Sequence, residues 1–184
     1  MGQGDARLVE RALAGDESAF AELYDRYARL VRAIARDGTN DLQQAQDLAQ
    51  EVFLRAYSKL GELKNPDRFG YWLASIARNV ARESRRSRLR ERHLWLGEEA
   101  EDLVDEQADE LRDTQETQDR LALLAEAISV LNDKERLALH SFYLQGQDIE
   151  RARRIVGISR SSFYRLLGRA KERVEAYMRE REER

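Results

Sequence analysis

Aromatic and basic side chains are concentrated in one stretch, RFGYWLASIARNVARESRRSRLR, which runs from Arg68 to Arg90. Aromatic rings stack on unpaired bases and guanidinium groups bind phosphates, so together they have the chemistry of a site for single-stranded nucleic acid. The alternative is that Phe69 and Trp72 are core residues of a small helical domain and that the arginines only keep it soluble. Residues 78–92 hold seven Arg and only two Glu. This imbalance favours a nucleic-acid surface.

A second candidate site lies in SRSSFYRLLGRAKERV, residues 159–174. The helical repeat predicts an inward face formed by Phe163, Leu166, Leu167, Ala170 and Val174. The outward side then carries hydroxyl, phenol and guanidinium groups, from Arg160, Ser161, Tyr164, Arg165 and Arg169. Guanidinium groups suit phosphates and guanine edges in a major groove. A helix with three such arginines is also common as an ordinary solvated surface, so both interpretations stay open for this helix alone.

Local signals around residues 159–174 predict a helix-turn-helix. Asp148 can cap DIERARRIV, Gly157 can end it in the left-handed conformation, and Ser159 can cap the next helix. A short helix, a three-residue turn and a second helix form this unit. Upstream, Asn132 and Glu135 have the spacing of a capping box. The preceding segment RLALLAEAISVL is predicted to turn one apolar face inward, with Leu121, Leu124, Ile128 and Leu131.

The N-terminal half also predicts helices. Asp16 or Ser18 can cap a helix with apolar residues at three- and four-residue steps, namely Phe20, Leu23, Tyr24, Tyr27, Val31 and Ile34. A second helix is predicted over residues 41–60, with Leu48, Val52, Phe53, Ala56, Tyr57 and Leu60 on its apolar side. Residues 61–69 hold the only Pro and are expected to form a loop. A third helix is predicted to start near Arg68 and to run through Trp72, Ile76 and Val80.

The composition fits an all-α protein and excludes several classes of site. One Pro, ten Gly and 36% charged residues favour helices with many surface ion pairs. The absence of Cys excludes disulfides and thiolate metal sites, and two His cannot build an imidazole site, so no metal or other cofactor is expected. No catalytic constellation stands out, so an enzyme is not expected. The sequence also has no signal peptide and no apolar run of membrane-spanning length, which predicts a cytoplasmic protein.

Charge divides the chain into three segments. Residues 1–97 carry 17 basic and 14 acidic side chains, residues 98–119 carry 1 and 11, and residues 120–184 carry 14 and 10. Blocks of like charge resist compaction, so residues 98–119 are predicted to be an acidic linker between two small helical domains. The alternative is a solvated helix face.

The order of these motifs resembles an extracytoplasmic-function sigma factor of bacterial RNA polymerase. The most specific segments are DLAQEVFLRAY, the FxxWLxxIARN pattern, and GIS followed by a helix containing RAK. Residues 1–97 resemble sigma region two, which docks on core polymerase and recognises and melts the minus-ten element. Residues 120–184 resemble sigma region four, which reads the minus-thirty-five element. The resemblance covers nearly the whole chain except the acidic linker and the termini.

The resemblance implies three sets of site residues. Polymerase docking would use Asp47, Gln50 and Glu51. The minus-ten DNA would meet a loop and the helix after it, through Lys64, Asn65, Arg68, Trp72, Arg78, Asn79 and Arg82. The minus-thirty-five DNA would meet Arg160, Ser161, Tyr164, Arg165 and Arg169. The implied partners are core RNA polymerase, promoter DNA and an anti-sigma factor that acts in trans, because no third domain follows region four.

Three positions depart from the family pattern: Asn132 stands where Pro is common, Arg153 where a small residue is usual, and Phe163–Leu166 where a Val-Lys-Ser-Arg type sequence is common. They bear on which promoter is read more than on the role. Two other functions compete. A helix-turn-helix regulator that binds duplex DNA without polymerase would leave the aromatic and basic helix and DLAQEVF unexplained. A helical adaptor without a DNA role would explain the acidic linker and the apolar stripes.

Overall fold

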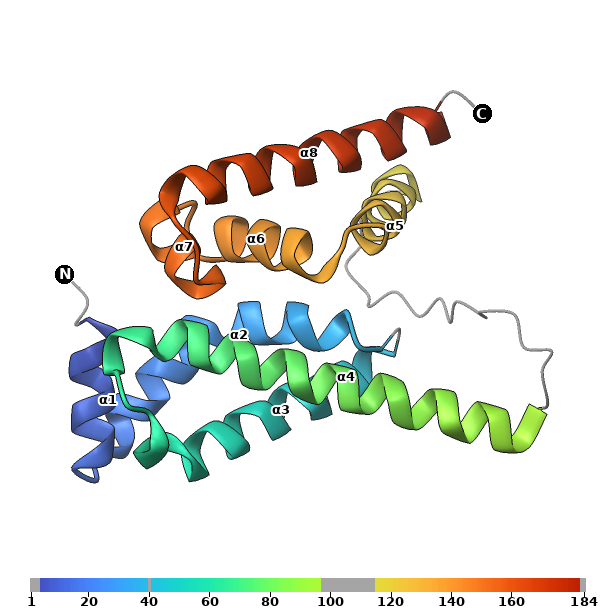
Figure 1. Ribbon diagram of the computed structural model, residues 1–184. Helices are drawn as coiled ribbons and strands as arrows, with labels where there is room; N and C mark the ends of the chain where they lie inside the picture. The colour runs from blue at the N-terminus through green and yellow to red at the C-terminus, as the bar shows by residue number, and fades with distance from the viewer. Residues whose placement is uncertain (1–3, 40, 97–114, 183–184) are drawn as a thin grey trace. The chain divides into compact units, whose positions relative to one another are not determined.

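The computed structural model describes residues 4–39, 41–96 and 115–182, and every regular element within these ranges is helical. The chain divides into two compact units, Met1–Asp105 and Glu106–Arg184 (Figure 1). The predicted all-α fold class is therefore confirmed.

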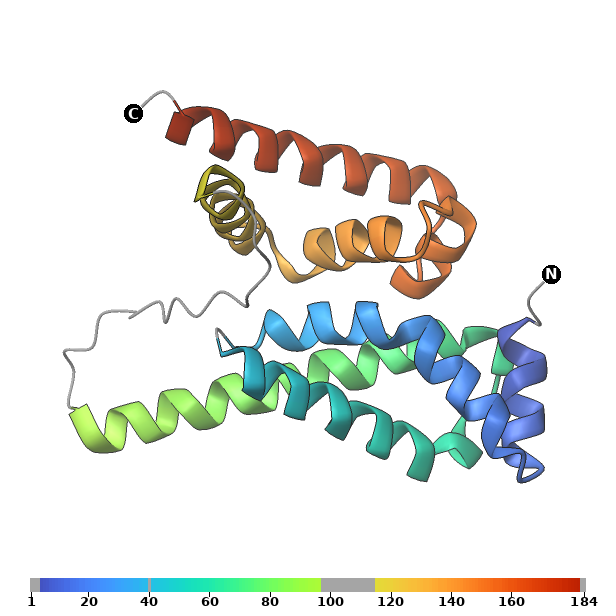
Figure 2. The same cartoon turned by 180° about the vertical axis from the view of Figure 1, so that it is seen from behind.

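The first unit is a bundle in which three long helices lie side by side: α2 (Glu17–Arg36), α3 (Leu42–Ser58) and α4 (Phe69–Leu96). The short α1 (Asp5–Leu13) packs across one end of them, as Figures 1 and 2 show from opposite sides. Large side chains fill the core, among them Leu8, Leu23, Tyr27, Val31, Val52, Phe69, Leu73 and Val80. The Tyr27 hydroxyl donates a 2.5 Å hydrogen bond to Asp5, so the buried phenol is satisfied and α1 is held to α2.

Side-chain caps start α2 and α3, at the positions where the sequence predicts these two helices to begin. Asp16 accepts from the Ser18 amide at 3.1 Å at the start of α2, and Asp41 accepts from the Gln43 amide at 2.7 Å at the start of α3. Within and beside the predicted loop the chain forms two 3₁₀ turns, Leu60–Glu62 and Pro66–Arg68.

The turn between α2 and α3 is fastened to α4. Gly38 lies so close to α4 that an added Cβ would be 2.8 Å from the Ala81 Cβ, so only glycine fits. Arg88 of α4 donates to the Gly38 carbonyl and, at 3.3 Å, to the Thr39 hydroxyl. These contacts set the position of α4, the helix that carries the aromatic and basic stretch.

The first unit differs from the sequence analysis in three ways. The sequence reasoning did not predict α1. Of the apolar residues named for the third predicted helix, Val80 is buried but Trp72 and Ile76 are only partly buried, and the inward side of α4 is formed instead by Phe69, Leu73, Ala77 and Val80. Tyr24 and Tyr57, placed on apolar sides, are 45% and 54% exposed.

Within residues 115–182 the second unit forms four helices: α5 (Gln115–Ser129), α6 (Asp133–Leu144), α7 (Ile149–Val156) and α8 (Arg160–Glu182). The predicted capping box is present, with Asn132 bound to the Glu135 amide at 3.1 Å and Glu135 bound back to the Asn132 amide at 3.1 Å. Gly157 ends α7 with φ of 78°, and the Ser159 hydroxyl accepts from the Ser162 amide at 3.3 Å. The predicted helix-turn-helix geometry is therefore present in α7 and α8.

The C-terminal half of α8 packs on α5 and on part of α6. Ala127, Leu131, Ala170 and Val174 form this second core, with Tyr177 and Met178 against it. Arg173 of α8 donates to the buried Glu135 carboxylate and to the Val130 carbonyl, each at 2.8 Å. These bonds tie α8 to the junction between α5 and α6.

One expectation for the second unit is wrong, and another concerns residues that are mostly not described. Leu121, predicted to face inward, is 57% exposed. The last five residues of the predicted linker over residues 98–119 belong to α5, and residues 98–114 lie outside the described residues.

Candidate nucleic-acid interfaces and docking face

One surface of α3, here called the docking face, carries Asp47, Gln50 and Glu51. Asp47 and Gln50 are exposed and Glu51 is partly exposed, while Ala49 and Val52 on the other side are buried. The structure therefore brings the three predicted docking residues together on an outward surface of a helix whose opposite side is core.

Glu51 already has a partner within the unit. Arg55, one turn later, donates to Glu51 at 2.6 Å and to Glu83 of α4 at 2.8 Å. The hydrogen bond to Glu83, followed by the one to Glu51, raises the pKa of Arg55 above its ordinary value. The acidic character that the docking face offers to a partner therefore rests mainly on Asp47.

Leu54 is a docking-face residue that the sequence reasoning missed. It follows Gln50 by four residues and Glu51 by three, so it lies on the same side of α3. Its side chain is 65% exposed, the highest value among the exposed large hydrophobic side chains of the described residues. The same spacing that groups Asp47, Gln50 and Glu51 could have found it. An exposed leucine between acidic and amide groups gives this face an apolar anchor.

The predicted loop residues lie exposed directly before α4. Lys64, Asn65 and Arg68 are all exposed, and Asn65 accepts from the Asp67 amide at 3.0 Å. Phe69, the next residue, is fully buried. The interpretation of Phe69 as a core residue is therefore correct, and it fixes the exposed loop to the core.

The candidate strand face on α4 consists of Trp72, Arg78, Asn79 and Arg82. Trp72 and Arg78 are partly buried, and Asn79 and Arg82 are exposed. Spacings of seven and three residues place Trp72, Asn79 and Arg82 on one side of α4, and Arg78 lies four residues before Arg82. The Arg78 Nε is buried and has no hydrogen-bond partner among the described residues. The buried Nε shows that the base of this side chain is packed into the unit, and any contact with DNA would have to come from the part of Arg78 that remains exposed.

The arginines further along α4 have different surroundings. Arg85, Arg86 and Arg90 are exposed, whereas Arg88 binds the turn after α2. The C-terminal turns of α4 project past the ends of α2 and α3 (Figures 1 and 2). This projecting end therefore presents several exposed cations.

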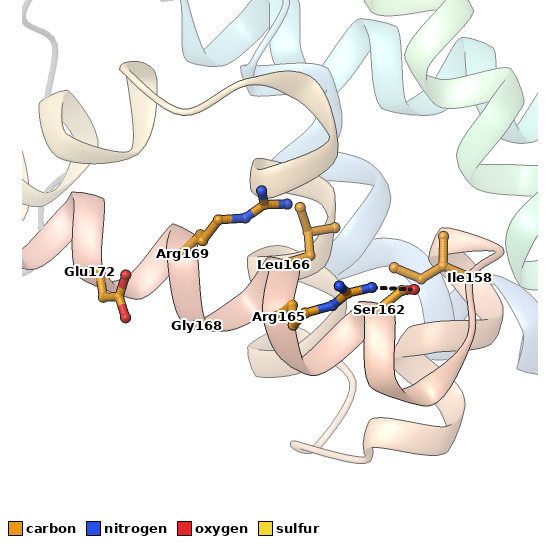
Figure 3. Close-up of a pocket in the computed structure, with 7 residues that line it drawn as sticks. All are labelled: Ile158, Ser162, Arg165, Leu166, Gly168, Arg169 and Glu172. Atoms are coloured by element: carbon orange, nitrogen blue, oxygen red, sulfur yellow. Dashed lines mark hydrogen bonds between the residues drawn. The ribbon is translucent and has the colours of Figure 1, made fainter.

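The candidate reading face is the outward side of α8, formed by Arg160, Ser161, Tyr164, Arg165 and Arg169. All five are exposed, and the five predicted inward residues of this helix are buried. Arg165 and Arg169 line an open hollow together with Ser162, Gly168 and Glu172 (Figure 3). Arg165 reaches back to the Ser162 hydroxyl at 3.5 Å. An added Cβ on Gly168 would meet no atom within 4 Å, so this hollow is open beside both arginines.

Glu150 of α7 is a further charged group next to the reading face, and the sequence reasoning did not single it out. It pairs with Arg153 at 2.6 Å and lies 3.8 Å from the Arg160 Nε. The hydrogen bond from Arg153, with the charges of Arg160 and Arg154, lowers the pKa of Glu150 below its ordinary value. The spacing of Glu150 and Arg153 was visible in the sequence, but the contact with Arg160 depends on how α7 packs against α8.

Two further properties of the described residues concern metal binding and membranes. No group of three or more His, Asp or Glu side chains in residues 4–39, 41–96 and 115–182 is arranged to hold a metal ion. In the same ranges no helix is both long enough and apolar enough to cross a bilayer.

Comparison with known sequences identifies related proteins. Residues 23–91 match the Sigma-70 region 2 family. The chain is 32% identical over 143 residues to the ECF RNA polymerase sigma factor SigL of Mycobacterium tuberculosis. The match covers 75% of this chain and 76% of SigL. It is 33% identical to the probable RNA polymerase sigma factor RfaY of Xanthomonas campestris and 32% identical to the ECF RNA polymerase sigma factor BldN of Streptomyces coelicolor. These matches cover 90% and 89% of this chain, but only 42% of RfaY and 61% of BldN.

Two solved structures share the fold. CnrH, in complex with the cytosolic domain of CnrY, has a TM-score of 0.64 and 22% identity, and the match covers 95% of this chain and 96% of CnrH. The sigma factor RpoE of Bartonella quintana, in complex with the anti-sigma factor NepR, has a TM-score of 0.58 and 23% identity, with 87% and 96% coverage.

Proposed function

The chain belongs to the extracytoplasmic-function family of RNA polymerase sigma factors, and we propose that it binds core RNA polymerase, directs it to particular promoters and helps to separate the strands of the minus-ten element. It works in the cytoplasm, and the polymerase supplies the catalytic chemistry. The observation that carries this proposal is the presence of three different surfaces in one chain: an acidic and apolar docking face, a strand face and a reading face. A protein that only binds duplex DNA would need the reading face alone.

Docking is assigned to α3. Asp47 and Gln50 offer polar contacts, Glu51 adds a carboxylate shared with Arg55, and Leu54 supplies an apolar anchor. A partner for such a face presents cations around an apolar groove. We assign this partner as core polymerase.

Promoter melting is assigned to the loop before α4 and to the strand face. Lys64, Asn65 and Arg68 are exposed where a flipped base could be received. Trp72 offers part of its ring for stacking, and Arg78, Asn79 and Arg82 offer donors to an unpaired strand. Minus-thirty-five recognition is assigned to the reading face, whose N-terminal half carries the hydroxyl and guanidinium groups that read a major groove.

The domain roles follow from these assignments. Residues 1–97 act as the region-two module, residues 120–184 as the region-four module, and the acidic residues 98–119 join them. RpoE was solved with the anti-sigma factor NepR bound, which supports the proposal that an anti-sigma factor also binds this chain.

The decisive test is transcription in vitro with purified core polymerase on a library of random promoters. Core polymerase alone and the chain alone serve as controls. We expect transcripts from a limited set of promoters only when both are present. Specific binding of the chain to duplex DNA without polymerase, together with no gain in transcription, would identify a polymerase-independent helix-turn-helix regulator.

A further inference from the structure

Glu150 is an acidic residue inside a basic segment, which Asp148, the cap of α7, and Glu172 border on either side. Residues 149–171 contain six Arg and one Lys, and Glu150 is the only acidic residue among them. A carboxylate on a DNA-binding surface repels phosphates of any sequence and weakens binding to all of them. The residues around Glu150 indicate which benefit offsets this loss of affinity.

The two oxygens of Glu150 face different arginines. Oε2 accepts from Arg153 of the same helix, with the Arg153 Nε at 2.7 Å and Nη2 at 2.6 Å. Oε1 faces the Nε of Arg160 at 3.8 Å, across the turn at the start of α8. The carboxylate is therefore held by α7 and directed at the first residue of the reading helix.

Arg160 also lies near an aromatic ring of its own helix. Its guanidinium carbon lies 5.9 Å from the centroid of the Tyr164 ring, one turn further along α8. The Arg160 side chain is 66% exposed, and such a long exposed side chain is normally free to choose among many rotamers. Glu150 and Tyr164 together restrict that choice.

We propose that Glu150 is a positioning residue of the reading face: it directs the Arg160 guanidinium to a base edge and withholds it from phosphates. This inference rests on the proposed promoter recognition by α8. Fixing a flexible side chain in advance reduces the entropy lost when it meets its base. The negative charge next to Arg160 also lowers its attraction for the phosphate backbone, which is the same in every sequence. Glu150 thus lowers overall affinity and raises discrimination.

The test replaces Glu150 by Gln, which keeps the shape and removes the charge. Holoenzyme made with the full chain is bound to a promoter library randomised at the minus-thirty-five element, and bound and unbound DNA are sequenced. Glu175→Gln is the matched control, because it removes the same charge from an exposed position of α8 about 22 Å along the helix from Arg160. Thermal unfolding is measured for each variant.

We expect Glu150→Gln to bind non-promoter DNA several-fold more tightly. We also expect its preference at one upstream position to fall about three- to tenfold, part of what a full base contact gives. Arg160→Ala should lose the same preference, and adding Glu150→Gln to it should change that preference no further. Glu175→Gln should keep the wild-type preference.

Three results would overturn the inference. If Glu150→Gln binds all sequences more tightly but keeps the wild-type preference, Glu150 is only a repulsive charge. If the variant only unfolds at a lower temperature, with unchanged binding, the pair with Arg153 serves α7 alone. If the wild-type holoenzyme enriches no upstream sequence, the proposed function fails and the inference fails with it.

Discussion

The contact between Arg173 and Glu135 is expected to be the most sensitive point of the second unit. Glu135 has a side chain only 6% exposed, and Arg173 reaches it from α8 at 2.8 Å. Replacing Arg173 by Met keeps much of the aliphatic stem but leaves the carboxylate without its cation. Removing one partner of a buried pair is costly because the other charge stays buried.

The cost can be bounded from the structure. A hydrogen bond to a charged group is worth about 1.5–3 kcal/mol. The Arg173 side chain is 48% exposed, so water can replace part of the hydrogen bonding that Glu135 loses. Val130 is also exposed, so water can bind its carbonyl once Arg173 is removed. We therefore expect a loss of about 2 kcal/mol, which lowers the Tm of a domain of this size by roughly 8–16 °C.

The two tryptophans make the measurement specific. Trp72 and Trp95 both belong to the first unit, so their fluorescence follows that unit, whereas far-UV circular dichroism follows both. Arg173→Met should move only the transition that fluorescence does not detect. Arg179→Met, an exposed position on the same helix, is the control. Adding Glu135→Gln should recover part of the loss, because Gln can still complete the capping box. A second-unit Tm within about 2 °C of the wild-type value would refute this reasoning.

The other predictions concern the three surfaces and one helix cap. Asp47→Arg should reduce co-purification with core polymerase at least about tenfold without lowering the Tm, because it reverses an exposed charge on the docking face. Arg78→Ala and Asn79→Ala should slow open-complex formation on duplex promoters, and promoters already mismatched at the start site should rescue them; normal permanganate reactivity on duplex DNA would remove both from the strand face. Arg165→Ala should relax specificity at one position by about 1–3 kcal/mol, whereas Arg169→Ala should weaken all promoters alike, as binding to singly substituted promoters would show. Hydrogen bonds from Ser18 and then Arg11 hold the pKa of Asp16 below its ordinary value of 3.8, so Asp16 stabilises the first unit above that pH and the stabilisation is lost as the pH falls through its lowered pKa. Urea unfolding followed by fluorescence should show a weaker pH dependence for Asp16→Asn, and an unchanged dependence would contradict the assignment.

Signals that act within a few residues could be predicted from the sequence. The caps at Asp16, Asp148 and Asn132 and the left-handed Gly157 depend on backbone groups two to four residues away. The inward face of α8 could be predicted because its apolar residues form a single stripe. These features were enough to predict the helix-turn-helix and the reading face before any packing was known.

The inward side of α4 could not be predicted in the same way. Its first half has two overlapping apolar stripes, one through Phe69, Leu73 and Ala77 and one through Trp72 and Ile76, so the helical repeat does not decide between them. Packing against α2 and α3 buries the first stripe and leaves the second partly exposed. The helix α1 was missed for a related reason: it has nine residues and depends on long-range contacts such as the one from Tyr27 to Asp5.

Arg55 shows why ion pairs between helices escape sequence reasoning and why this one matters for function. Its pair with Glu51 follows from their four-residue spacing, but Glu83 lies 28 residues away and meets Arg55 only because α3 packs on α4. One guanidinium thus neutralises an acid on the docking face and an acid on the helix that carries the strand face. Reversing the charge of Glu51 would push Arg55 away and also disturb its contact with α4. A loss of polymerase binding in Glu51→Arg would therefore combine two effects, whereas Asp47 reports on docking alone.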